Sequence, residues 1–216
     1  MAFGSDMEEK IVEVFKGKEL KNILHIGACL GEEKSFYDKL NPERVYWFEP
    51  NPQLIPKLKE KIKSDEYESI LFPHAVGKEN GSFPFNIIGD DRGSNPGCSS
   101  LRGLKEHSTM YPNIKFKETV NVDVVNIDDF INQNNLVKEF DLVSLDTQGN
   151  DFDILTTSEF LFTAKAVVIE TSSLELYQGQ VVEEKITEYM ESKGFIKTYH
   201  SAWHPTWGDT LYIKNE

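Results

Sequence analysis

Short apolar runs that alternate with helix-like segments constrain the fold of this chain more than any other feature. Several runs are rich in β-branched residues and polar only at their ends, which is typical of strands buried on both faces of a parallel sheet. Strands that alternate with helices predict βαβ units and a doubly wound, mainly parallel sheet in an α/β fold. Strands are expected at residues 22–26, 45–48, 69–75, 82–88, 119–126, 142–146, 166–171, 195–201 and 210–214. Helices are expected at residues 8–15, 34–39, 52–64, 127–132, 152–156 and 183–193.

Three segments depart from this alternation. Residues 195–201 and 210–214 follow each other with no helix between them, which predicts an antiparallel hairpin at one sheet edge. Residues 1–20 are expected to form an N-terminal helix or extension. Residues 89–112 are rich in Gly and Pro, and long irregular segments of compact domains are typically lids or binding loops, so we predict a lid or substrate loop there. A chain of 216 residues is expected to form a single domain, 1–216.

The charge balance excludes several classes of partner. The chain has 36 acidic and 23 basic residues, a net charge of −13. So negative a surface repels phosphate backbones, and no nucleic acid is expected as a partner. No apolar run approaches the roughly 20 residues that cross a bilayer, so no membrane partner is expected. Two cysteines, Cys29 and Cys98, favour a reducing compartment, and we expect a cytoplasmic protein. The sequence does not indicate an oligomeric state.

The turn after the first expected strand has the composition of a ligand-binding turn. Gly27 and Gly31 allow a ligand to approach the backbone closely, and open α/β sheets bind ligands where strands end. The second strand ends at Glu49, and an acid at that place accepts hydrogen bonds from both hydroxyls of a ribose. Cys29 stands where dinucleotide-binding turns have their middle glycine, so a cofactor with a ribose but no phosphate, such as S-adenosylmethionine, fits better. A tight strand–helix turn without a ligand is the alternative.

A series of motifs resembles the FkbM-type S-adenosylmethionine-dependent methyltransferases. The resemblance is sharpest at residues 145–151 (LDTQGND) and is also clear at 25–31 (HIGACLG) and 47–52 (WFEPNP). It extends through further segments at residues 74–77, 99–101, 122–130, 170–177 and 207–212. Each segment is loose, but their order and spacing together cover nearly the whole chain. The resemblance implies a class I methyltransferase fold, which is a Rossmann-like, mainly parallel seven-stranded sheet with an antiparallel C-terminal hairpin.

The resemblance also assigns cofactor-binding positions, with S-adenosylmethionine as the cofactor. Those for the methionine portion are Gly27, Ala28 and Gly31. Those for the ribose and the adenine are Glu49, Pro50, Asn51, His74, Ala75 and Val76. Those beside the sulfonium and the acceptor are Asp146, Thr147 and Gln148, with Ser99 on a loop that closes over the site.

The expected reaction is methyl transfer to a hydroxyl of a small molecule or carbohydrate, since the resemblance implies sugar or polyketide-type acceptors. Removing the hydroxyl proton calls for a general base. Asp146 is the first candidate, followed by Glu170 and His200. Stacking on a sugar face would suit Trp203, Trp207 and Tyr177, and ordinary packing would suit them as well.

Several alternatives remain open from the sequence. Many methyltransferases have an acid where this chain has His25, so His25 is either a ligand contact or a core histidine, and Asp146 or a backbone carbonyl would hold the cofactor amine. No metal site is expected, because Asp151 and Asp153 would diverge on a helix. An NAD(P)-dependent oxidoreductase shares the strand, glycine turn and acid. A catalytically inactive methyltransferase fold that acts as a binding module is the other alternative.

Overall fold

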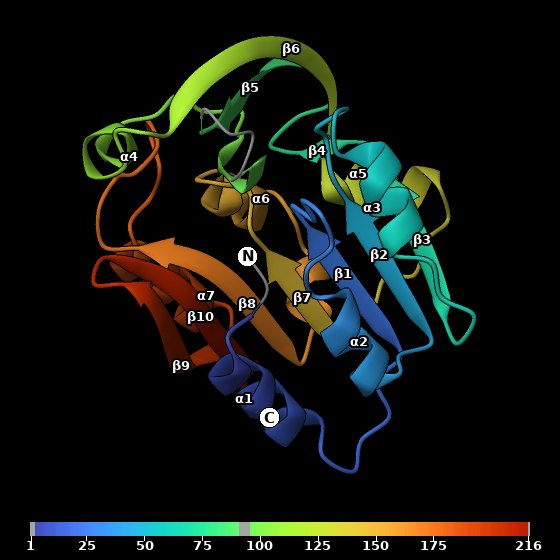
Figure 1. Ribbon diagram of the computed structural model, residues 1–216. Coiled ribbons are helices and arrows are strands. Elements are labelled where there is room, and N and C mark those ends of the chain that lie inside the picture. The colour runs from blue at the N-terminus through green and yellow to red at the C-terminus, as the bar shows by residue number, and fades with distance from the viewer. Residues whose placement is uncertain (1–2, 91–95, 216) are drawn as a thin grey trace.

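The computed structural model describes residues 3–90 and 96–215 of the chain (Figure 1). Its central sheet has seven strands in the order β3-β2-β1-β7-β8-β10-β9. These strands are β1 (Asn22–Ile26), β2 (Arg44–Phe48), β3 (Glu68–Phe72), β7 (Leu142–Leu145), β8 (Ala166–Ser172), β9 (Phe195–His204) and β10 (Trp207–Lys214). The first five are parallel, and β10 runs antiparallel to both β8 and β9. The predicted α/β fold and its C-terminal hairpin at a sheet edge are therefore confirmed.

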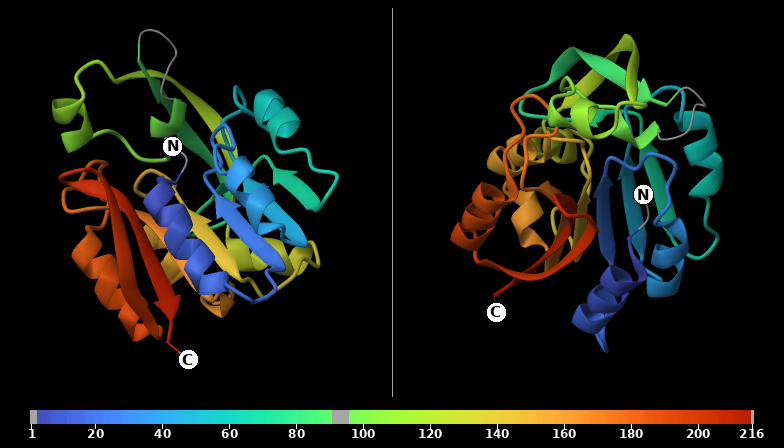
Figure 2. Two further views of the ribbon diagram at one scale, coloured as in Figure 1. Left: turned by 60° about the horizontal axis from the view of Figure 1, so that its bottom comes forward. Right: turned by 60° about the vertical axis from the view of Figure 1, so that its left-hand side comes forward.

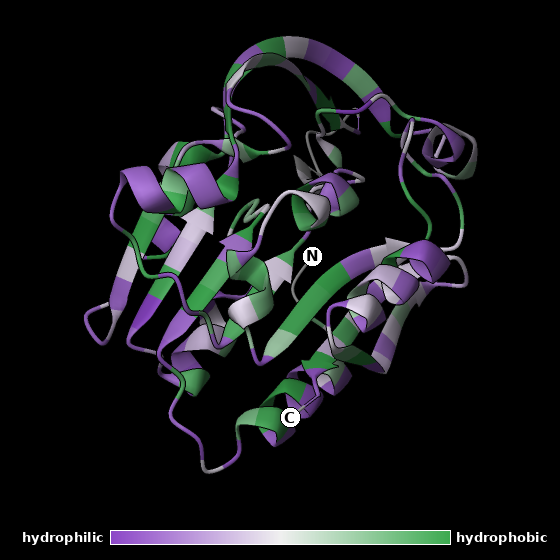
Figure 3. Cartoon of the chain, turned by 180° about the vertical axis from the view of Figure 1, so that it is seen from behind, coloured by the Kyte–Doolittle hydropathy of each residue, from purple (hydrophilic) through white to green (hydrophobic). Residues whose placement is uncertain are grey.

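Helices cover both faces of this sheet (Figure 2). The helices α1 (Ser5–Phe15), α2 (Lys34–Leu40) and α3 (Ile55–Lys61) pack on one face. The helices α5 (Ile127–Gln133), α6 (Asp151–Thr156) and α7 (Glu183–Ser192) pack on the other. Alternate side chains of one strand supply the two cores, since Ile23 of β1 packs under the first layer and Leu24 under the second. Seen from behind, the central strands are hydrophobic over most of their length, whereas the covering helices carry polar residues as well (Figure 3).

A second, smaller sheet was not predicted. It has the strand order β4-β6-β5, formed by β4 (Ala75–Val76), β5 (Gly81–Gly89) and β6 (Lys115–Val125). In Figure 1, β6 arches over the top of the molecule with β5 beside it and the short helix α4 (Glu106–Met110) at one end. The expected strand at 69–75 therefore ends early, at Phe72, because Pro73 has no N–H to continue a ladder.

Two local expectations need correction or refinement. The helix expected at 52–64 begins only at Ile55, because the Asn51 side chain accepts the N–H of Gln53 at 3.0 Å and closes a turn there instead. Gly194 follows the end of α7 with a φ of +85°, and its N–H bonds to Glu191 O at 3.0 Å, as expected for a residue after a helix C-cap. None of the helices in residues 3–90 and 96–215 combines the length and hydropathy needed to cross a membrane.

Candidate functional site

The turn after β1 packs directly against the end of β7. Gly27 N and Ala28 N both donate to Phe48 O at 2.9 Å, which binds the turn to β2. Gly27 has a φ of +90°, and a Cβ at this position would lie 1.9 Å from Asp146 O. Only glycine fits this close approach. The sequence therefore places the backbone of the first turn against the residue that ends the fourth parallel strand.

The Gly27→Ala variant is expected to lose about 2–4 kcal/mol of stability, because it combines a left-handed residue with a backbone clash. Thermal unfolding measures this loss. Gly194→Ala is the matched control, since Gly194 has a similar φ of +85° but no atom within 4 Å of an added Cβ. A Tm for Gly27→Ala equal to that of Gly194→Ala would contradict the close packing of the turn.

Glu49 is held at the end of β2 by backbone amides. Its Oε2 accepts from Cys29 N at 2.7 Å and its Oε1 accepts from Asn51 N at 2.7 Å. The side chain is only 5% exposed. Burial raises the pKa of Glu49 to about 7, and the two amides act against this rise. The carboxylate is thus fixed across the glycine turn.

A small cavity of about 50 Å³, here called the inner cavity, lies where β1, β2 and β7 end. The predicted cofactor residues that line it are Gly27, Glu49, Pro50, His74, Ala75, Val76, Ser99, Asp146, Thr147 and Gln148. The structure thus brings together residues from positions 27 to 148, as the parallel strands require. Its further lining residues, which sequence reasoning missed, are Ile26, Cys29, Phe85, Gly97, Leu101 and Asn150.

Four of the six missed residues lie in segments of the family resemblance, at 25–31, 99–101 and 145–151, but no cofactor contact was assigned to them. Phe85 reaches the cavity from β5, and the sequence did not indicate that β5 belongs to a second sheet. Asn150 donates from Nδ2 to Val76 O at 2.9 Å, which fixes the turn after β7 to the start of the small sheet. Cys29 stood out in the sequence only as a departure from glycine, yet it faces the cavity, and burial raises the pKa of its thiol.

Three predicted cofactor residues do not line the inner cavity. Ala28 is buried in the core under α1, α2 and α3. Gly31 has a φ of +65°, and an added Cβ would lie 2.9 Å from the Leu58 side chain, so this glycine allows α3 to pack closely. Asn51 acts indirectly, through its N–H bond to Glu49. In the structure these three residues support the turn and its neighbours, and their contact with the cofactor stays a prediction.

His25 is a core histidine in the structure. It is 2% exposed, its Nδ1 lies 2.9 Å from Tyr37 Oη, and its ring stacks on Trp47 at a centroid distance of 5.1 Å. Burial lowers the pKa of His25 to about 3, so the ring is neutral. Its other nitrogen, Nε2, lies 3.8 Å from the buried carboxylate of Glu33. The core interpretation of His25 is thus the one that the geometry supports.

Two carboxyl groups meet beside the inner cavity, at the ends of β7 and β8. The side-chain nitrogen of Gln148 lies 2.5 Å from Asp146 Oδ1 and 2.6 Å from Glu170 Oε2. Burial and the charge of Asp146 raise the pKa of Glu170 well above its ordinary value. The Glu170 carboxyl beside Asp146 therefore favours its protonated form.

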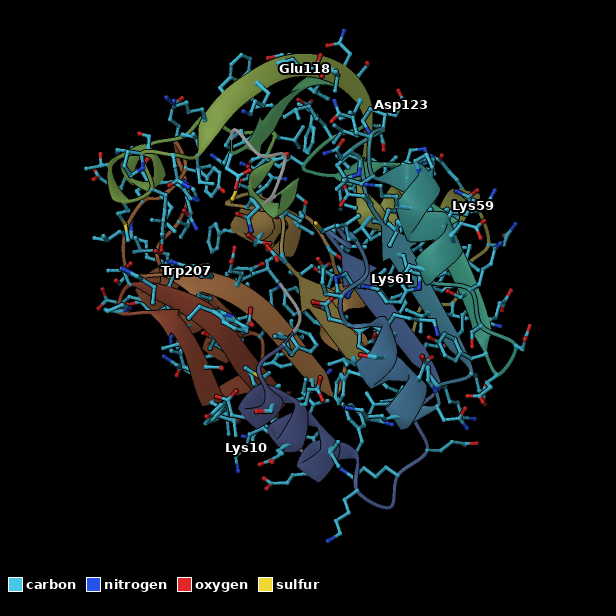
Figure 4. All side chains as sticks on the ribbon, viewed as in Figure 1. Lys10, Lys59, Lys61, Glu118, Asp123 and Trp207 are labelled. Carbon is cyan, nitrogen blue, oxygen red and sulfur yellow. The ribbon has the colours of Figure 1, made fainter. Side chains whose placement is uncertain are left out.

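A larger cavity of about 750 Å³, here called the outer cavity, continues from the inner one. Cys29, Gly97, Asp146 and Gln148 line both, and Glu170 lines the outer one. Its aromatic wall comes from α4 and β10, where Trp207 Nε1 donates to Tyr111 Oη at 2.9 Å. Figure 4 shows Trp207 at the end of the strand layer, below α4.

The segment predicted as a lid or substrate loop is bound to the body of the protein where it is described. Its positions 91–95 lie outside the described residues. Beyond them, Lys105 N and His107 N donate to Leu176 O at 2.8 and 3.2 Å, so α4 is docked on the segment after β8. His107 and Tyr111 of this segment line the outer cavity.

The structure does not bring His200 to either cavity. Its Nδ1 lies 2.8 Å from Thr210 Oγ1 and 3.8 Å from Glu183 Oε1, because β9 is the edge strand beyond β10. Trp203, on the same strand, is 37% exposed and donates to Asp209 Oδ2 at 2.8 Å. The expectation that His200 acts as a base is therefore corrected, since the hairpin places it two strands away from Glu170.

Among the described residues, no three His, Cys, Asp or Glu side chains are grouped to hold a metal ion.

Buried acids make the stability of the free protein depend on pH. Burial raises the pKa of Glu33 to about 8 and those of Glu49 and Asp209 to about 7. Unfolded Glu and Asp are ionised above about pH 6, so above this pH the native state holds protons that the unfolded state has lost. Each such proton makes stability fall by up to about 1.4 kcal/mol per pH unit as pH rises. The lowered pKa of His25 makes stability fall as pH decreases, because unfolded His25 binds a proton that the native state excludes. This effect begins only below the ordinary His pKa of 6.5.

We therefore expect the Tm to fall by about 5 °C or more between about pH 6.5 and about pH 8.5. Calorimetric scans across this range measure the trend. Glu33→Gln is expected to reduce the slope of Tm against pH, because it removes the acid with the highest of the three raised pKa values. A Tm that stays constant or rises over the range would show that these acids are not protonated in the native state.

Comparison with known proteins identifies relatives. The family model described as the methyltransferase FkbM domain matches residues 25–197. The 2-O-methyltransferase NoeI of Sinorhizobium fredii (strain NBRC 101917 / NGR234) is 26% identical over 174 residues, which are 79% of this chain and 71% of that protein.

Solved structures share the fold at low sequence identity. Magnesium protoporphyrin IX methyltransferase of Synechocystis PCC 6803 with bound SAM has a TM-score of 0.50 and 8% identity, over 97% of this chain and 77% of that one. The ribosomal protein L11 methylase of Lactobacillus delbrueckii subsp. bulgaricus has a TM-score of 0.51 and 11% identity, and the match covers 98% of this chain and 79% of that one. The fold is thus that of class I methyltransferases, as expected.

Proposed function

The chain belongs to the FkbM methyltransferase family, and we propose that it transfers the methyl group of S-adenosylmethionine to a hydroxyl group of a sugar or another small metabolite. Family membership supports methyl transfer. The relative NoeI is a 2-O-methyltransferase, which supports oxygen as the methylated atom. When bound, S-adenosylmethionine supplies an activated methyl group, and the protein supplies orientation and electrostatics.

The observation that carries this proposal is the arrangement of Gly27 and Glu49 in the lining of the inner cavity. The backbone cradle at Gly27 is a place that a Cβ would fill. Across it, the Glu49 carboxylate is buried and held by two N–H groups, with lone pairs left to accept from a ribose. Val76, Phe85 and Leu101 add apolar surface for a planar base. These residues fit a nucleoside.

We propose Asp146 as the general base, with Glu170 as its partner. Asp146 lies at the junction of the inner and outer cavities, where a cofactor and an acceptor would meet. Its carboxylate would take the proton of the attacking hydroxyl, and a positioned base of this kind contributes about 10²–10⁴-fold to the rate. Glu170 would hold its own proton and leave Asp146 as the group that accepts.

The outer cavity supports a neutral, hydroxylated acceptor. A volume of about 750 Å³ is within the range of ligand pockets. Asp146, Glu170 and Glu32 line it and would repel an anionic acceptor. Trp207 and Tyr111 offer an aromatic wall of the kind that packs on a sugar ring. The free thiols of Cys29 and Cys98 support a reducing compartment, so the proposal places the enzyme in the cytoplasm.

Calorimetric titration with S-adenosylmethionine and, in parallel, with NADH tests the proposal. We expect saturable binding of S-adenosylmethionine and none of NADH. Binding of NADH alone would favour an oxidoreductase, and no binding of either at millimolar concentration would favour an inactive binding module. A screen of hydroxylated acceptors with a radiolabelled methyl donor then identifies the substrate class.

A further inference from the structure

Gln148 has a backbone conformation that side-chain-bearing residues rarely adopt. Its φ is +56°, and the next residue, Gly149, has a φ of +98°. The carbonyl oxygen of Gln148 accepts from Ser100 Oγ at 2.7 Å, which fixes this turn to the segment after β5. Left-handed positions for residues other than glycine cost about 1 kcal/mol or more and concentrate at functional sites. The fold thus maintains an unfavourable conformation that directs a long amide side chain toward β8.

The orientation of the Gln148 amide follows from the two carboxyl groups. Their oxygens accept, so the NH₂ group of Gln148 faces Asp146 and Glu170, and Oε1 faces Tyr177. Tyr177 Oη lies 2.6 Å from Gln148 Oε1 and 3.1 Å from Cys98 O. Burial raises the pKa of Tyr177 well above its ordinary value, so the phenol keeps the single proton that these two acceptors share. One N–H is then directed to Asp146 and the other to Glu170.

Most of the described groups around the pair are acidic or neutral, and Lys57 is the cation among the described residues that line the outer cavity. The charged groups that act on the Glu170 carboxyl are Asp146, Asp209 and Asp151, and the groups around Asp146 include Glu49, Glu32, Cys29, Cys98 and Tyr177. Lys57 lines the outer cavity but makes no ion pair with Asp146 or Glu170 among the described residues. The two carboxyl groups are thus bridged by a neutral double donor.

We propose that Gln148 is a positioning residue for methyl transfer: it spans Asp146 and Glu170, fixes the Asp146 carboxylate toward the acceptor, and stabilises the negative charge on the pair through its two N–H groups. This inference deepens the proposed function and rests on it for the role of the acceptor. A neutral donor suits the task, because a lysine at this place would make Asp146 a weaker base and a third carboxyl group would repel both.

Two matched variants test the role of the donors. Gln148→Met keeps the length of the side chain and removes both N–H groups. Gln180→Met is the control, since Gln180 Oε1 accepts from Leu176 N and Tyr177 N at 2.9 and 3.1 Å and therefore has a structural role in the same region. The first readout is the affinity for S-adenosylmethionine as a function of pH, because a cationic cofactor favours the ionised pair.

Affinity is expected to rise with pH in the wild type, with a midpoint set by the carboxyl pair. In Gln148→Met this midpoint is expected to move up by about one pH unit or more, because the charged pair has lost two donors. Gln180→Met is expected to keep the wild-type midpoint, whatever happens to its Tm. An unchanged midpoint in Gln148→Met, or the same shift in both variants, would overturn the inference.

The second readout needs no cofactor. The side-chain ¹⁵NH₂ resonances of Gln148, assigned by their absence from Gln148→Met, are expected to shift with the ionisation of the pair in the free protein. Resonances that stay constant from about pH 5 to about pH 9 would overturn the inference even if the enzyme binds its cofactor. Titrating resonances in a protein that fails to bind S-adenosylmethionine would support the bridge and would instead contradict the proposed function.

Discussion

Asp146→Asn is expected to lower methyl-transfer turnover by about 10²–10⁴-fold, the usual contribution of a positioned base. The asparagine side chain has the same shape, and its oxygen can still accept the N–H of Gln148 that now reaches Asp146 Oδ1 at 2.5 Å. What it cannot do is take a proton from the acceptor hydroxyl. S-adenosylmethionine is still expected to bind through Glu49 and the Gly27 turn, with an affinity lowered by the loss of the Asp146 charge beside the sulfonium.

A radiolabelled methyl donor with the acceptor found in the screen measures the turnover of this variant. Asp153→Asn is the control. Asp153 lies on α6, forms ion pairs with Arg102 and Lys78, and lines neither cavity. We expect this control to retain wild-type turnover. Equal turnover in Asp146→Asn and the wild type would remove Asp146 from the mechanism.

Glu49→Ala is expected to weaken S-adenosylmethionine binding by about 100-fold or more. Hydrogen bonds to a charged group contribute about 1.5–3 kcal/mol each, and a ribose would present two hydroxyls to this carboxylate. The substitution also removes the acceptor that holds Cys29 N and Asn51 N at 2.7 Å, so the glycine turn keeps only its bonds to Phe48 O as attachments to the end of β2 among those described. Titration calorimetry measures the affinity, and thermal unfolding confirms that the variant is folded.

Glu33→Gln is the matched control for this prediction. Glu33 is also a buried acid close to the first turn and is 6% exposed. Its carboxylate lies 3.8 Å from His25 Nε2 in the core, and it lines neither cavity. We expect the affinity of this variant to stay within about threefold of the wild type. If Glu49→Ala bound as tightly as Glu33→Gln, the proposed ribose contact would be wrong.

The central sheet could be predicted because its strands are defined by local composition. Runs such as residues 166–171 are apolar over most of their length, and their alternation with helices leaves few topologies. The hairpin could be predicted because no helix separates its strands. The small sheet could not, since β5 and β6 pair across the long segment between them and their alternation does not indicate which sheet they join.

The candidate site was predictable where a residue ends a strand, and less so where a residue acts through its neighbours. Glu49 and Asp146 directly follow buried strands, so the sequence alone places both at the carboxyl edge of the sheet. The position of Gln148 between two carboxyl groups depends on Glu170 and Tyr177, which lie 22 and 29 residues further along the chain. The sequence does not indicate which strand of the C-terminal hairpin lies at the edge of the sheet. Because β9 is the edge strand, His200 lies outside the cavities.

The crystal structure of the protein soaked with S-adenosylhomocysteine tests the central claim most directly. We expect density for the nucleoside in the inner cavity, with both ribose hydroxyls within hydrogen-bond distance of the Glu49 carboxylate and the thioether beside Asp146. An inner cavity that stays filled by protein side chains at saturating ligand, or a ligand bound away from Gly27 and Glu49, would contradict this claim.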